Sequence, residues 1–204
     1  EGLRKKLEHD FAIGRPDRLK RADLADALAR AEDHDEYGDH GPDREELERV
    51  LGQRFGFEVH RVVPREGSSV VRTIDRERHV ITVSESLAEH ALKFQLAAAL
   101  GLLALDEDHL HEHLTESFSP RHAETRRLIK IHLANYFAGA LLLPYDDYFK
   151  HVQRTHYDVD ALAALFEMSY EACAHRLCNL SDPKKPGIPL HFLRVDIAGN
   201  ISKR

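Results

Sequence analysis

The feature that most constrains the fold is a change of hydrophobic period near residue 55. Before it, the segments 22–29 and 43–51 repeat apolar residues at helical spacing. After it, apolar and polar residues alternate in three short runs bounded by turn-forming residues, at 57–63, 69–74 and 79–83. This pattern predicts three strands, which we expect to form a short antiparallel sheet.

Helical spacing then returns for the rest of the chain. One long helix is predicted from an N-cap at Ser84 to Leu103, and a second over 122–143, ending at Pro144. The segment 159–177 predicts two short helices around a tight turn, and 191–196 a last strand. The expected fold is α+β, with the sheet packed on the two long helices.

Three parts of the chain are expected from this order. Residues 1–54 form an N-terminal helical segment with an acidic loop at 32–42, and residues 55–157 form the core. Residues 158–204 form a helix-turn-helix-like pair and a terminal strand packed on that core.

Composition narrows the classes of function. A net charge of −6 disfavours nonspecific nucleic-acid binding, and no apolar run approaches the ~20 residues that cross a membrane. Cys173 and Cys178 have neither disulfide nor metal-clip spacing. Two small thiols on one helix favour a reducing compartment, so we expect a cytoplasmic protein.

The first long helix has the length of a metallopeptidase helix but lacks its chemistry. Zinc peptidases carry His-Glu-x-x-His on such a helix, where two imidazoles one turn apart bind the metal and the glutamate acts as general base. When this chain is aligned with that motif, Ala98, Ala99 and Leu102 occupy the positions of His, Glu and His. A helix of this kind suggests a pocket kept for binding, with no metal in this chain.

The second long helix strengthens the comparison. Residues 134–144 read Ala-Asn-Tyr-Phe-Ala-Gly-Ala-Leu-Leu-Leu-Pro, and together with the order of strands and helices this resembles the ImmA/IrrE family of small zinc metallopeptidases. The family's acidic ligand falls at Ile131. Because all ligands and the base are missing together, the resemblance implies a peptidase scaffold that is not an enzyme.

Further motifs resemble the short-chain acyl-CoA-responsive regulators of actinobacteria, which control propionate and acetate metabolism. They are Phe-Gln-Leu-Ala at 94–97, Tyr-Asp-Val at 157–159 and Arg-Val-Asp-Ile-Ala-Gly-Asn-Ile-Ser-Lys-Arg at 194–204. Such regulators have an N-terminal helix-turn-helix domain and a C-terminal cysteine-bearing domain, both absent here. The resemblance implies an isolated sensor domain, in a homo-oligomer that contacts DNA only through the absent domain.

The implied effector is coenzyme A or a short-chain acyl-CoA, such as propionyl-CoA or acetyl-CoA. Its phosphates need arginine or lysine donors, and its pantetheine arm needs a narrow apolar cleft with few polar contacts. The candidate ligand-binding residues are Arg72, Lys93, Ala98, Tyr136, Arg176 and Arg194.

Structural roles are alternatives for these side chains. Arg72 can be an exposed strand residue, Arg176 can stabilise a helix end, and Arg194 can pair with Asp196 or another carboxylate. Tyr136 can be a core aromatic residue.

Two other functions stay open. A divergent zinc peptidase would need ligands outside the motif, and a DNA-binding module would use the helix pair at 159–180. His109, His111 and His113 alternate in an acidic segment that we interpret as a solvated loop.

Overall fold

The computed structural model describes residues 41–64, 70–107 and 123–203. These form two compact units that divide between Leu142 and Leu143, so the predicted core segment 55–157 spans parts of both. The helix predicted at 22–29, most of the acidic loop and the three alternating histidines lie outside the described residues. Within the described part, no helix is long and apolar enough to span a membrane.

The first unit begins with helix α3, Arg44–Phe55, which confirms the helix predicted at 43–51. The Asp43 side chain accepts a hydrogen bond from the Glu46 N–H at 2.8 Å and so caps the first turn. The helix ends at Gly56, whose φ of 72° is the left-handed conformation that favours glycine.

Three strands follow, and they confirm the predicted three-stranded sheet: β1 (Glu58–Val62), β2 (Arg72–Asp75) and β3 (Val80–Ser84). Their order is β1-β3-β2, with β3 in the centre. β2 pairs antiparallel with β3, but β1 pairs parallel with it, so the expectation of a purely antiparallel sheet was wrong.

The reason for the strand order lies in the sequence of β3. Ile81 and Val83 are fully buried, whereas most side chains of β1 are exposed. The most apolar strand occupies the centre, where it is hydrogen-bonded on both sides, and the charged strands become the edges. A direct hairpin between β1 and β2 would have left β3 at an edge.

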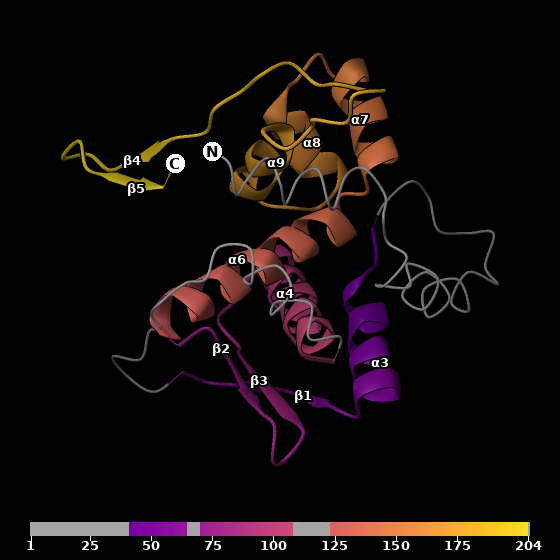
Figure 1. Cartoon of the computed structure of the whole chain (residues 1–204), viewed down its shortest axis with the longest axis vertical. Coiled ribbons are helices and arrows are strands. Elements are labelled where there is room, and N and C mark those ends of the chain that lie inside the picture. The colour runs from indigo at the N-terminus through magenta and orange to yellow at the C-terminus, as the bar shows by residue number, and fades with distance from the viewer. Residues whose placement is uncertain (1–40, 65–69, 108–122, 204) are drawn as a thin grey trace. The chain divides into compact units, whose positions relative to one another are not determined.

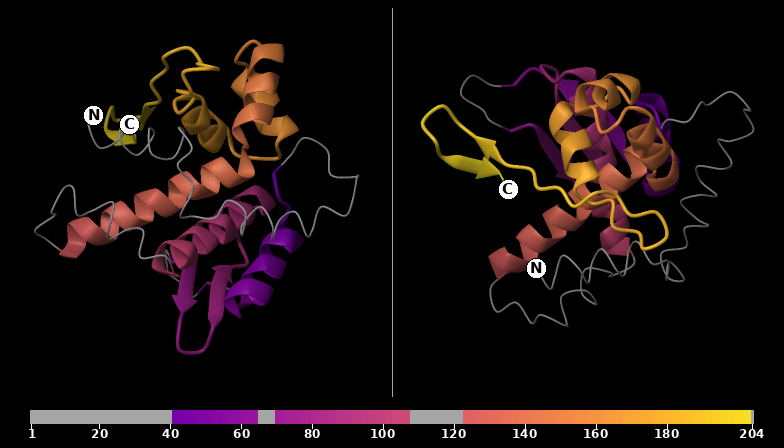
Figure 2. Two further views of the ribbon diagram at one scale, coloured as in Figure 1. Left: turned by 45° about the vertical axis from the view of Figure 1, so that its right-hand side comes forward. Right: turned by 90° about the horizontal axis from the view of Figure 1, so that it is seen from above.

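Helices α4 (Glu89–Glu107) and α6 (Ala123–Leu142) are the two long helices that the sequence predicts. They lie side by side, and α4 also contacts α3 and β3 (Figures 1 and 2). The helix α4 begins five residues after the predicted N-cap, because Ser84 is the last residue of β3 and donates its N–H to the Val71 carbonyl.

The second unit starts with α7 (Tyr145–Arg154), a helix that the sequence analysis missed. It is followed by α8 (Val159–Leu165) and α9 (Tyr170–Leu177), which confirm the predicted helix pair. Ser169 caps α9 as expected, since its hydroxyl accepts the Ala172 N–H at 3.1 Å.

The chain's last described elements are β4 (Arg194–Val195) and β5 (Ile201–Lys203), which form an antiparallel hairpin. The sequence predicts a single strand at 191–196 packed on the core. The structure instead has a two-stranded ribbon in which Val195 is 52% and Ile201 is 56% exposed.

Candidate functional site

The face of α4 that corresponds to a metallopeptidase motif is packed rather than open. Ala98 and Ala99 are 1% and 0% exposed. Leu102 and, on α6, Ile131 are half-buried. Among the described residues, no three histidine, cysteine, aspartate or glutamate side chains are placed to hold a metal ion. The residues of this face therefore offer no ligand set for zinc.

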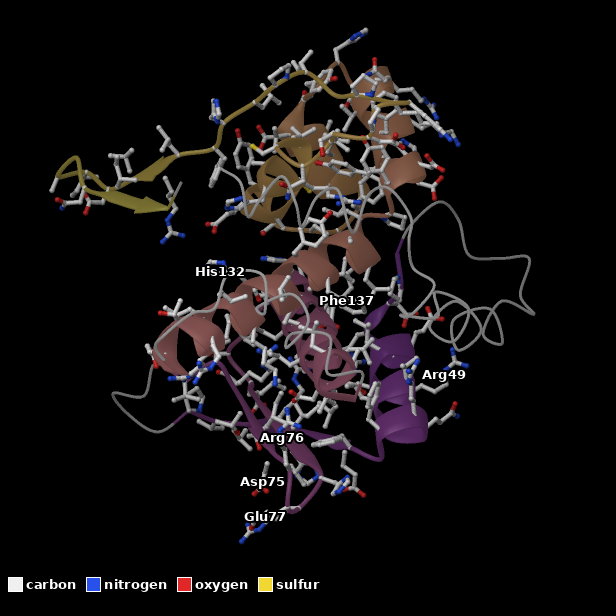
Figure 3. The ribbon with its side chains drawn as sticks, viewed as in Figure 1. Arg49, Asp75, Arg76, Glu77, His132 and Phe137 are labelled. Atoms are coloured by element: carbon white, nitrogen blue, oxygen red, sulfur yellow. The ribbon has the colours of Figure 1, made fainter. Side chains whose placement is uncertain are left out.

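Close helix packing explains why this face is closed. A Cβ atom added to Gly101 would lie 2.8 Å from Cδ1 of Phe137 and 3.2 Å from the Ala134 carbonyl oxygen, both on α6 (Figure 3). The helices can approach this closely only because Gly101 has no side chain. At Gly101, the space expected for a binding pocket beside these small residues is therefore filled by the neighbouring helix.

Arg72 is the most informative of the predicted ligand-binding residues. It opens β2, is half-buried, and donates from Nη1 to the Gln95 carbonyl oxygen of α4 at 2.6 Å. Among the described residues it forms no ion pair with a carboxylate. Burial lowers the pKa of its guanidinium, although an arginine still remains charged at neutral pH. A half-buried cation with one carbonyl partner retains free donors suited to an anion.

Lys93 and Tyr136 belong to the same unit as Arg72. Lys93 is half-buried on α4, and Tyr136 is half-buried on α6. The structure therefore places four of the six predicted residues, Ala98 included, in the unit that ends at Leu142.

The other two predicted residues lie in the second unit, and each has a structural partner there. Arg176 is only 6% exposed, and its Nε donates to the Leu143 carbonyl at 2.9 Å while its guanidinium lies 5.6 Å from the Tyr145 ring centroid. Arg194 forms an ion pair with Glu171 at 2.8 Å. These contacts favour a structural role for both arginines. The carboxylate partner of Arg194 is Glu171 and not Asp196.

The same contacts bear on the helix pair as a DNA-binding element. On α9, Arg176 is buried and Glu171 is engaged by Arg194. A recognition helix instead needs cationic and polar side chains free to reach a groove. The pair therefore packs within its unit.

Two features of the first unit escaped the sequence analysis. Asp106, near the end of α4, forms ion pairs with Arg76 and with Lys130 of α6. Arg76, labelled in Figure 3, lies in the turn between β2 and β3. The second feature is Arg61, an exposed residue of β1. The sequence held a signal for Arg61: successive residues of a strand point to opposite faces, so Arg61 lies on the face opposite to that of His60.

The chain belongs to the IrrE N-terminal-like domain family of the M78 peptidases, whose model matches residues 52–178. That match covers α4, α6 and the three-stranded sheet.

Similar proteins of known name are transcriptional regulators. The chain is 35% identical over 165 residues to the HTH-type regulator RamB and 34% identical over 159 residues to PrpR, both of Mycobacterium tuberculosis. It is 41% identical over 129 residues to the propionyl-CoA carboxylase regulator of Cereibacter sphaeroides. These matches cover 81%, 78% and 63% of this chain.

The chain spans about a third of these relatives, since the matches cover 34%, 32% and 28% of their lengths. A solved structure of a Mycobacterium tuberculosis transcriptional regulator is also similar, with a TM-score of 0.74 and 30% identity over the whole of this chain and 59% of the other.

Proposed function

We propose that this chain is the effector-binding part of a transcriptional regulator of short-chain fatty acid metabolism. In this proposal it binds a short-chain acyl-CoA, such as propionyl-CoA or acetyl-CoA, and does not catalyse a reaction. The names of the similar proteins support the regulatory role. Apolar residues at the positions of metal ligands and base support the absence of zinc-peptidase chemistry in this proposal.

The observation that carries the proposal is the environment of Arg72. Its guanidinium is half-buried beside α4, and its one described partner is an uncharged carbonyl. Burying a cation without a counter-charge is costly, so the site gains most from a ligand that supplies negative charge. A phosphate of coenzyme A fits because arginine binds it through two parallel hydrogen bonds. Lys93 and Tyr136, both half-buried, are the proposed neighbours of this contact; Ala98, which is 1% exposed, is not.

Calorimetric titration of the chain with coenzyme A, acetyl-CoA and propionyl-CoA tests the proposal. We expect binding that Arg72→Gln weakens by about tenfold or more, because a charge-assisted bidentate contact contributes roughly 1.5–3 kcal/mol. Arg78→Gln is the matched control, since Arg78 is exposed at the other end of β2 and β3 and lies 3.9 Å from Asp75. Absence of binding at millimolar ligand would refute the proposal.

The remaining elements of the proposal concern the whole regulator. We propose a cytoplasmic homodimer that contacts DNA through a helix-turn-helix domain, with ligand binding shifting the arrangement of that domain. Sedimentation with and without acyl-CoA tests the dimer. Stoichiometric zinc in the purified chain would favour a peptidase instead, and a salt-dependent gel shift by this chain alone would favour DNA binding through 159–180.

A further inference from the structure

The register of the sheet places a second arginine across β3 from Arg72. Val83 of β3 pairs with Arg61 of β1 on one side and with Arg72 of β2 on the other. Paired residues on adjacent strands direct their side chains to the same face of a sheet. Because neighbouring strands are about 4.8 Å apart, the two arginine Cα atoms are separated by roughly 10 Å.

This face is the one that packs against the core. Val83 and Ile81, which alternate with Thr82 along β3, are both 0% exposed. Arg61 and Arg72 therefore flank a buried valine at the edges of the sheet. Arg72 is half-buried against α4, whereas Arg61 is exposed.

The charges of the two arginines are not balanced within the described part of the chain. Neither side chain forms an ion pair with any described carboxylate. Other arginines of this unit do, as Arg44 pairs with Glu89 at 2.8 Å and Arg76 pairs with Asp106. Two like charges on one face without counter-ions repel each other, and an anion shared between them would relieve that repulsion.

We infer that Arg61 and Arg72 bind two separate phosphate groups of one ligand, an inference that rests on the proposed function. Coenzyme A carries a diphosphate and, at a distance from it, a phosphate on the ribose. Arg72, held by α4 and partly desolvated, binds the diphosphate. Arg61, on the exposed edge strand, binds the terminal ribose phosphate and thereby distinguishes coenzyme A from nucleotides that lack this group.

Calorimetry with coenzyme A and dephospho-coenzyme A, which lacks the ribose phosphate, tests this assignment. We expect Arg61→Gln to weaken binding of coenzyme A by about tenfold, equivalent to about 1.4 kcal/mol, and to leave binding of dephospho-coenzyme A unchanged. Arg72→Gln should weaken both ligands. Arg78→Gln again serves as the control, and circular dichroism verifies that each variant is folded.

Three outcomes would overturn the inference. If Arg61→Gln binds coenzyme A as the unmodified chain does, Arg61 does not contact the ligand, and the proposed function survives. Equal weakening of both ligands by Arg61→Gln would exclude the ribose phosphate as its partner. If the unmodified chain binds neither ligand, the proposed function fails, and the inference fails with it.

Discussion

The close approach of α4 and α6 predicts opposite effects of the same substitution at two helical glycines. A Cβ at Gly101 would meet Phe137 at 2.8 Å and the Ala134 carbonyl at 3.2 Å, whereas a Cβ at Gly139 would meet no atom within 4 Å. In mid-helix, alanine is favoured over glycine by about 0.5–1 kcal/mol. Gly139→Ala should therefore raise the free energy of unfolding by about that amount.

At Gly101 the same gain is outweighed by overpacking. Forcing a methyl group into a packed interface typically costs about 1–3 kcal/mol, so Gly101→Ala should lower the free energy of unfolding by roughly 0.5–2 kcal/mol. The backbone carbonyl of Ala134 cannot move aside as a side chain can. Phe137→Leu removes the nearer of the two contacts. In a double-mutant cycle it should therefore recover part of the stability that Gly101→Ala loses.

Urea unfolding followed by circular dichroism measures both variants on the same scale. The reasoning would be refuted if Gly101→Ala stabilised the chain as much as Gly139→Ala. That result would mean that the two helices do not approach closely at Gly101.

Three further predictions concern the second unit. Arg176→Lys should lower the free energy of unfolding by about 1–3 kcal/mol, because lysine cannot both bind the Leu143 carbonyl through Nε and lie over the Tyr145 ring; an unchanged urea midpoint would contradict this. Tyr148→Phe should cost about 1 kcal/mol, since the buried hydroxyl donates to the Cys173 carbonyl at 2.7 Å, and a calorimetric scan measures the loss. Burial raises the pKa of the Cys173 thiol to about 11 from an ordinary value near 9, so the unfolded chain loses this proton first and stability should fall as pH rises from about 9 to 11. The fall should be smaller in Cys173→Ala, measured by urea unfolding across that range.

The order of strands and helices could be predicted from the sequence because hydrophobic period is a local property. The prediction of the strands at 57–83 rests on alternation alone, and that of the two long helices on helical spacing alone. Strand order depends on which strand buries most, and that requires comparing Ile81 and Val83 with residues of the other two strands. The central position of β3 could have been inferred from that comparison.

The missed helix α7 shows a different limit. Pro144 follows the helical pattern of α6, and the sequence analysis predicts only a helix end there. Proline lacks a donor N–H, which is no disadvantage at the start of a helix, and here it is the N-cap residue of α7. The two acidic residues that follow, Asp146 and Asp147, were the further signal of a helix start.

The candidate site also shows what the sequence could predict and what only tertiary contacts decide. Sequence reasoning could select Arg72 and Arg176 as cations able to bind phosphate, but it could not separate them. One lies beside an uncharged carbonyl with donors to spare, and the other is buried between Leu143 and Tyr145. That difference depends on tertiary contacts between residues far apart in the chain.

The central position of β3 also sets the order in which the sheet can assemble. β2 and β3 are joined by the short turn at 76–79, so their hairpin closes locally, whereas β1 can pair with β3 only after a longer loop has closed. Until that step, one edge of the most apolar strand remains open to pairing with another chain. The risk of aggregation during folding is therefore greatest before β1 pairs with β3. Substitutions that weaken β1 should lower the yield of refolding markedly, even where they change the free energy of unfolding only slightly.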